Sequence, residues 1–183
     1  MTPKLLTIDQ LKLHGTPEYF GLGFIQLKVD KTYRYHFYHH SLEPIVPDDE
    51  IHDHRYSFKS HILQGEFTQL LYNFEVDHMG THEIQNVDCE GPSDQVFEKT
   101  WGNLKLINRS TYSTGSSYWI DRDVLHTVIA HNNAVTLLER GAVVKQFARV
   151  ARPRGTESVC PFSAPLGAER CWELIADMLP KQA

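Results

Sequence analysis

Hydrophobic and polar positions between Gly21 and Val150 form short runs of β-branched and aromatic residues that are separated by turn residues. No sustained helical period appears in this stretch, so the runs are typical of strands in a sandwich or barrel. Turn residues at Gln64-Gly65 and at 131–133 predict hairpin connections. The predicted strands are 22–29, 32–39, 57–63, 66–76, 104–107, 117–120, 126–129, 134–140 and 143–150.

The chain changes character after the last predicted strand. Three prolines and a glycine between Arg152 and Pro165 mark the exit from the β region. Apolar residues then recur at helical spacing over about 166–179, and Pro180 ends the run. We therefore predict an all-β protein with one C-terminal α-helix that covers the barrel or an oligomer contact.

Length and composition narrow the class of protein. The 183 residues fit a single domain, 1–183, with a barrel over about 20–150. The net charge of −5 and the lack of a Lys/Arg block exclude a nucleic-acid partner, and no apolar run is long enough for a membrane span. Three widely spaced cysteines form no disulfide framework, which favours a cytoplasmic location.

Histidine is the unusual residue of this chain. Six of the 11 histidines fall between positions 36 and 61. In an extended segment, His52 and His54 point to the same side and Asp53 points to the other. Two neutral imidazoles on one face are part of a transition-metal site that needs a further ligand from elsewhere. The alternative interpretation of this His-x-His pair is an ordinary polar strand edge.

The spacing after these histidines resembles a known family. The stretch HDHRYSFKSHILQG at 52–65 has the frame of the first cupin motif, His-x-His-x(3,4)-Glu-x6-Gly, with Phe58 in place of the glutamate. Gly115 and His126 fit the glycine and histidine of the second cupin motif. Segments 51–65 and 118–128 also look like the ligand segments of cysteine dioxygenase and related thiol dioxygenases. Small bacterial and phage cupins with an HxHxxxF-type motif are similar as well.

This resemblance implies a fold and a metal site. It implies a cupin-type double-stranded β-helix, also called a jelly-roll barrel, in which distant strands bring three ligands to one ion. The ligands carried over by position are His52, His54 and His126, and the thiol dioxygenases hold Fe(II) with such a set. Cupins often pair through outer sheet edges, so the resemblance also implies a homodimer.

A three-histidine site has a defined charge. Neutral imidazoles leave a divalent ion its full charge, which favours a small anionic substrate such as a thiol, carboxylate or diketone. With Fe(II) we expect a non-heme dioxygenase; with Zn, Ni or Mn we expect Lewis-acid chemistry such as hydrolysis or isomerisation. The alternatives are a binding or sensor module that only captures a metal or small ligand, and a metal-free isomerase.

Four further residues are candidates for substrate binding. Phe58 supplies an apolar wall that excludes water and keeps a coordination position open. On the strand 32–39, Arg34 and His36 share a face, but the sequence does not fix whether that face points inward. If it does, Arg34 could bind a carboxylate and His36 could support the site. Arg140 has the same standing at the end of its strand.

Overall fold

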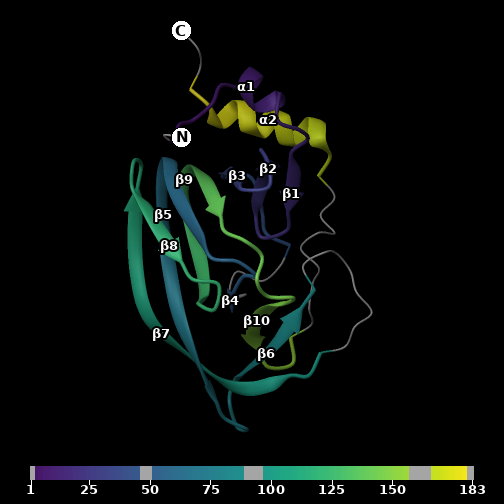
Figure 1. Cartoon of the computed structure of the whole chain (residues 1–183), viewed down its shortest axis with the longest axis vertical. Coiled ribbons are helices and arrows are strands. Elements are labelled where there is room, and N and C mark those ends of the chain that lie inside the picture. The colour runs from purple at the N-terminus through teal and green to yellow at the C-terminus, as the bar shows by residue number, and fades with distance from the viewer. Residues whose placement is uncertain (1–2, 46–50, 89–96, 157–165, 181–183) are drawn as a thin grey trace.

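The computed structural model describes residues 3–45, 51–88, 97–156 and 166–180, and these form ten strands and two helices (Figure 1). The elements in chain order are α1 (Ile8–Lys12), β1 (Glu18–Phe20), β2 (Phe24–Lys28), β3 (Tyr33–Tyr38), β4 (Ile51–His52), β5 (Phe58–Val76), β6 (His82–Val87), β7 (Thr100–Ser113), β8 (Ser117–Ile120), β9 (Leu125–Arg140), β10 (Ala148–Pro153) and α2 (Ala168–Met178).

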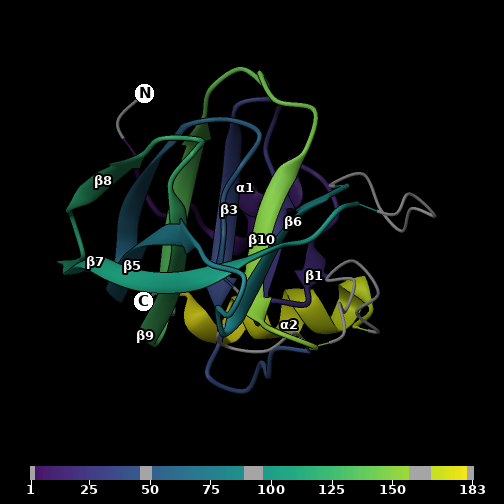
Figure 2. The same ribbon diagram turned by 90° about the horizontal axis from the view of Figure 1, so that it is seen from below.

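The strands close into a barrel. All pairings are antiparallel, in the order β1-β2-β3-β9-β4-β10-β6-β7-β5-β8, and a further pairing joins β9 to β5. That pairing closes a ring through β9, β4, β10, β6, β7 and β5, so the barrel has no free edge there. Strands β3, β2 and β1 extend the sheet beyond β9, and β8 extends it beyond β5 (Figure 2). The predicted all-β, jelly-roll type of fold is confirmed.

Two long strands, β5 and β9, connect the parts of the barrel. They pair along most of their length, and the register shifts between Ile62 and Glu66. Gly65 has a φ of 78° at this bulge, a conformation that glycine adopts without strain, and Asn133 on β9 has a φ of 51°. The predicted turns at 64–65 and 131–133 are wrong, because these residues bend continuous strands instead of ending them.

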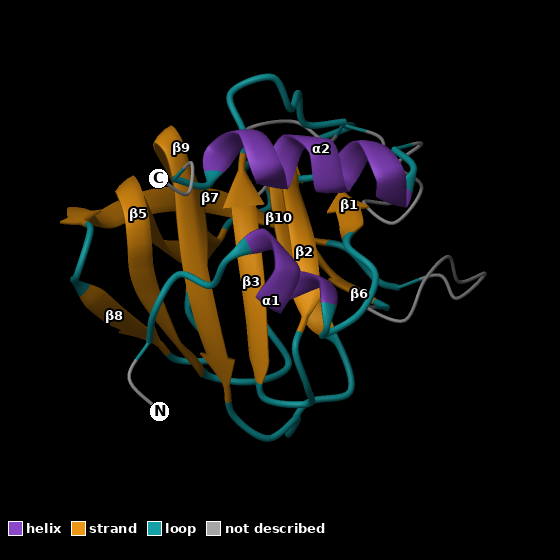
Figure 3. Cartoon of the chain, turned by 90° about the horizontal axis from the view of Figure 1, so that it is seen from above, coloured by secondary structure: helices purple, strands orange, loops and turns teal. Residues whose placement is uncertain are grey.

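The helices cover the outer face of β2, β3 and β9 (Figure 3). Tyr35 and Phe37 on β3 pack there against buried residues of α2, including Cys171 and Ile175. The helix α2 has its apolar positions on one side, as the predicted C-terminal helix requires. No helix in the described ranges is long and apolar enough to cross a membrane.

The opposite face of β3 points into the barrel. Arg34 lies opposite Leu138 on β9 and His36 lies opposite Thr136, and directly paired residues share a face of the sheet. The rings of His36 and Tyr38 contact Phe24, at centroid distances of 4.6 and 5.2 Å. Both faces of β3 are therefore covered, which is why the sequence pattern alone left the phase of this strand open.

Other differences from the predicted elements are local. The strand predicted at 143–150 lies at Ala148–Pro153, and β6 and α1 were not predicted. The strand predicted at 104–107 is the middle of the longer β7. The short helix α1 begins with a capping box between Thr7 and Gln10, a local signal that the sequence does contain.

The packing of α2 gives the first prediction. Replacing Ile175, which is fully buried, with alanine should lower the free energy of unfolding by about 2 to 5 kcal/mol, because it leaves a cavity under the helix. Glu173→Ala on the exposed side of α2 should change it by less than about 1 kcal/mol. Urea unfolding of both variants checks this, and equal losses would contradict the placement of α2.

Candidate metal centre

Two of the three candidate ligands lie directly opposite each other on neighbouring strands. His52 on β4 pairs with His126 on β9, although 73 residues lie between them in the chain. The two residues are thus distant in the chain but adjacent in the barrel wall. Directly opposed residues of an antiparallel pair project their side chains to the same face. The rings of His52 and His126 accordingly lie 5.1 Å apart, measured between their centroids.

The third histidine completes a compact cluster. One nitrogen from each of His52, His54 and His126 lies within 4.8 Å of the other two. Nε2 of His54 and Nε2 of His126 are 2.9 Å apart. Two nitrogens bound at right angles to one ion, each at about 2.1 Å, would be separated by about 3.0 Å. The spacing of His54 and His126 therefore fits a shared transition-metal ion, and His52 lies close enough to be a third ligand.

The surroundings of two of these imidazoles, those of His54 and His126, favour the neutral form. Burial is the main cause that lowers the pKa of His54 well below its ordinary value, and the neighbouring His52 and His126 add to it. Burial and then His52 lower the pKa of His126 in the same direction. Neutral imidazole is the form that binds a metal, because its free nitrogen carries the lone pair. Nδ1 of His126 is buried and has no hydrogen-bond partner.

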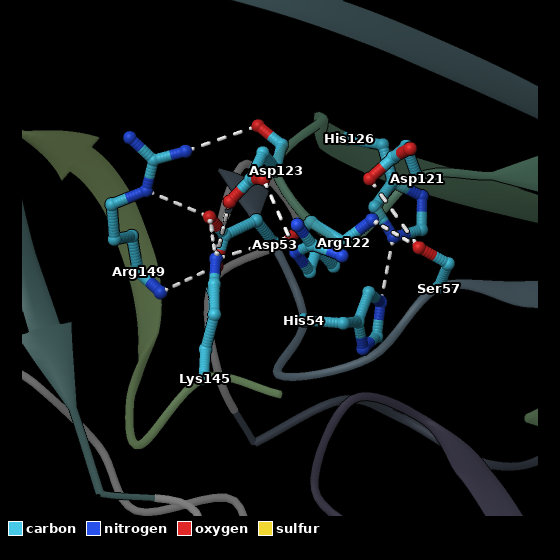
Figure 4. A network of polar contacts seen from close by, with 9 residues as sticks. All are labelled: Asp53, His54, Ser57, Asp121, Arg122, Asp123, His126, Lys145 and Arg149. Carbon is cyan, nitrogen blue, oxygen red and sulfur yellow. Dashed lines mark hydrogen bonds and ion pairs between the residues drawn. The ribbon is translucent and has the colours of Figure 1, made fainter. Parts of the chain in front are cut away.

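Asp53, between the two histidines of the His-x-His pair, points away from the cluster, as predicted. Its side chain is buried and accepts hydrogen bonds from Lys145 Nζ at 2.8 Å, Arg149 Nε at 2.7 Å and Arg149 N at 2.7 Å. Figure 4 shows this network beside His54 and His126. The carboxylate therefore fixes the segment that carries two candidate ligands to the segment that leads into β10.

The same network reaches the segment before the third ligand. Lys145 Nζ donates to Arg122 O at 3.2 Å and forms an ion pair with Asp123 at 3.1 Å (Figure 4). On the other side, Arg122 N donates to Ser57 Oγ at 3.1 Å. Residues 121–123 lead directly into β9 and His126. Polar contacts outside the cluster therefore set the spacing between the two segments that supply the histidines.

Phe58 lies beside the histidines, as an apolar wall would. Its ring centroid is 4.8 Å from that of His54 and 6.0 Å from that of His126, and only 3% of the residue is exposed. The position where the cupin motif carries a carboxylate thus holds a ring that cannot bind an ion. The three histidine nitrogens remain the candidate metal-binding atoms of this cluster.

The other three candidates also point into the barrel. Arg140 lies opposite Phe58 in the β5–β9 ladder, and Arg34 and His36 lie on the inward face of β3. Burial, followed by the positive charge of Arg34, lowers the pKa of His36 to about 3. Their roles toward a substrate remain predictions, but the structure places all three on the inner surface that also carries the histidines.

Two inward residues, Tyr56 and Gln69, were missed in the sequence. The Tyr56 ring lies 5.7 Å from that of His54 and has the Arg140 guanidinium over it at 4.6 Å. Gln69 is 2% exposed, and its side-chain nitrogen has no hydrogen-bond partner. Gln69 on β5 lies opposite Val128, two residues from His126 on β9, so Gln69 and His126 share the inner face of the barrel. The sequence does not reveal this before the β5–β9 register is known.

The barrel and the three converging imidazoles define the class of protein, a cupin-type fold with a candidate metal centre. These three side chains fit a divalent transition metal, because each offers an imidazole nitrogen and the three nitrogens lie close together. His61 does not join them: its Nε2 lies 3.6 Å from Glu139. The cupin resemblance in the sequence and the three-histidine cluster therefore agree.

Solved structures similar to this chain include two dioxygenases and a cupin. A hydroquinone 1,2-dioxygenase from Sphingomonas sp. TTNP3 with 4-hydroxybenzoate bound is 12% identical over 62% of this chain, with a TM-score of 0.34. This chain spans 63% of the length of that enzyme. An RmlC-like cupin from Shewanella frigidimarina is 16% identical over 69% of this chain and 83% of its own, with a TM-score of 0.34.

A further structure is the hydroquinone 1,2-dioxygenase PnpCD in complex with Cd2+ and 4-hydroxybenzonitrile. It is 11% identical over 75% of this chain and 73% of its own, with a TM-score of 0.36. No family model matches the chain, and no curated protein matches it. What this chain binds is therefore inferred from its own residues.

The Asp53 network gives a second prediction. Asp53→Ala should lower the free energy of unfolding by about 3 kcal/mol, because Lys145 and Arg149 lose the buried carboxylate that neutralises them. Asp123→Ala, which removes the exposed carboxylate of the same network, should cost less than about 1 kcal/mol. Urea unfolding measures both free energies. An Asp53→Ala protein as stable as Asp123→Ala would show that Asp53 does not hold the two segments together.

Proposed function

We propose that the protein is a mononuclear, metal-dependent oxygenase in which His52, His54 and His126 bind one divalent transition metal. The observation that carries this proposal is the cluster of three ligand nitrogens within 4.8 Å of one another. Fe(II) is the proposed ion, and Zn, Ni and Mn are the alternatives that the same nitrogen set accepts. The proposal includes the cytoplasmic location and the homodimer, which stay predictions.

The charge of the site supports a small anionic substrate. Neutral histidines leave the full charge of a divalent ion in place, and Phe58 contributes no carboxylate to reduce it. Fe(II) in such a site would supply oxygen activation once an anionic substrate binds. A thiol, a carboxylate or a diketone in its enolate form has the required charge. The reaction class proposed is therefore dioxygenation of a substrate of this kind.

The chain's own residues prepare the place where such a substrate would bind. Phe58 excludes water from one side of the histidine cluster, which strengthens electrostatic interactions there. Arg34 and Arg140 supply positive charge on the same inner surface and would orient the anionic end of the substrate. His36 stays neutral beside Arg34 and can exchange hydrogen bonds without adding charge.

Metal content provides the direct test. Full-length protein purified without chelator should carry about one metal ion per chain, and His126→Ala should lower metal affinity by more than about 100-fold, because loss of an outer partner of a ligand alone costs about 10- to 100-fold. His82→Ala is the matched control, because His82 lies on β6 and hydrogen-bonds Thr81 outside the cluster. Elemental analysis and competition with a chromogenic chelator measure occupancy and affinity. Full occupancy in His126→Ala would remove the proposal.

Oxygen consumption tests the reaction. After anaerobic loading with Fe(II), the protein should consume oxygen in the presence of at least one substrate among thiols, diketones and hydroxyaromatic acids. The loss of His54, which would remove one ligand nitrogen, should abolish this uptake, whereas His82→Ala should retain it. An oxygen electrode measures both. Metal binding without uptake for any of these substrates would favour a binding or sensor module.

A further inference from the structure

Two arginines share the inner surface of the barrel near the histidine cluster. The guanidinium carbon of Arg140 lies 4.6 Å from the centre of the Tyr56 ring, and that of Arg34 lies 5.9 Å from it. Arg34 Nη1 donates to Gln26 at 2.9 Å, which is a neutral partner. Nε of each arginine is buried and has no hydrogen-bond partner. Both guanidinium groups thus keep unused donors.

No ion pair within the described residues neutralises the charge of these two arginines. Within the described ranges, neither Arg34 nor Arg140 forms an ion pair with a carboxylate, whereas the buried carboxylates of Asp53 and Glu83 are each paired with other cations. Burial is the main cause that lowers the pKa of Arg34; Arg140 acts in the same direction, whereas Tyr56 and the carboxylate of Glu18 oppose it. Two guanidinium groups that are partly removed from water cost free energy unless negative charge accompanies them.

The position of the pair links it to the histidines. Tyr56 connects the two groups, because its ring contacts Arg140 and lies 5.7 Å from the ring of His54. Phe58, whose ring lies 6.5 Å from that of Tyr56 and 4.8 Å from that of His54, lies opposite Arg140 in the β5–β9 ladder. The rings of Tyr56 and Phe58 therefore form an aromatic wall that runs from the histidine cluster to the arginines.

We propose that Arg34 and Arg140 together bind a dianionic oxoanion headgroup of the phosphate type, while the other end of the ligand faces the histidine cluster. This inference rests on the proposed function and specifies its substrate class. One carboxylate neutralises only one guanidinium, whereas a phosphate-type group supplies two negative charges and enough oxygens to accept hydrogen bonds from both. The aromatic wall then accommodates a short linking segment.

Two isosteric probes isolate the charge of the headgroup. Methyl phosphate loses its second proton with a pKa of about 6, so it is a dianion at about pH 8, whereas methyl sulfate is a monoanion of the same shape. Calorimetric titration of the metal-depleted full chain should show methyl phosphate binding at least about tenfold more tightly than methyl sulfate. Equal affinities for the two probes would overturn the proposal.

Substitutions assign this preference to the pair. Arg34→Met and Arg140→Met keep the apolar stem and should each abolish the preference for methyl phosphate, whereas Arg140→Lys, which keeps a charge, should restore part of it. Arg109→Met is the matched control, because Arg109 is an exposed arginine on β7, and it should retain the full preference. A preference that survives in both methionine variants would also overturn the proposal.

Metal analysis of the same samples separates this inference from the proposed function. Arg34→Met and Arg140→Met should bind metal as the unmodified chain does, because they leave the three histidines intact. Metal binding without any preference between the probes would refute the binding of a dianionic headgroup by the two arginines and would leave the proposed metal site unaffected. A preference for methyl phosphate in a chain that binds no metal would refute the proposed oxygenase function and would still support an anion-binding site at the two arginines.

Discussion

The buried carboxylate of Asp53 is the constraint on which the candidate site depends. Strand alternation that sends His52 and His54 into the barrel necessarily sends the residue between them to the other side. There Asp53 is 1% exposed and bound by Lys145 and Arg149, so its charge is compensated outside the site. The charged groups that hold this segment in place thus lie on the opposite side from the imidazoles that the segment carries.

The two long strands explain how one barrel holds both a histidine cluster and an arginine pair. On β9, His126 stands near the beginning of the strand and Arg140 at its end, and both project inward. The bulge at Gly65 lets β5 follow the bend of β9 while the ladder continues on both sides. The strands that close the barrel therefore also span the site from one end to the other.

The sequence predicted the parts of the site that depend on local periodicity. The i, i+2 spacing identifies His52 and His54 as neighbours on one face, and the cupin-like spacing adds His126. Periodicity could not orient Arg34, because the helices cover the outer face of β3 and the barrel encloses the inner one. Gly65 misled the strand prediction because a positive φ serves a bulge as well as a turn. Tyr56 and Gln69 became visible only through long-range register.

The inner surface combines cationic and neutral donors with aromatic walls. Burial lowers the pKa of two candidate metal ligands, His54 and His126, and neither guanidinium group forms an ion pair with a carboxylate within the described ranges. A barrel selected for stability alone would pair or remove such charges, since an apolar interior of the same volume costs less. Their presence, together with the buried Gln69 nitrogen that has no hydrogen-bond partner, supports the proposal that a ligand completes the hydrogen bonds and charge of this inner surface. If the proposed anion binds there, the stability lost to these groups is recovered, because a ligand that binds only the folded state raises its stability.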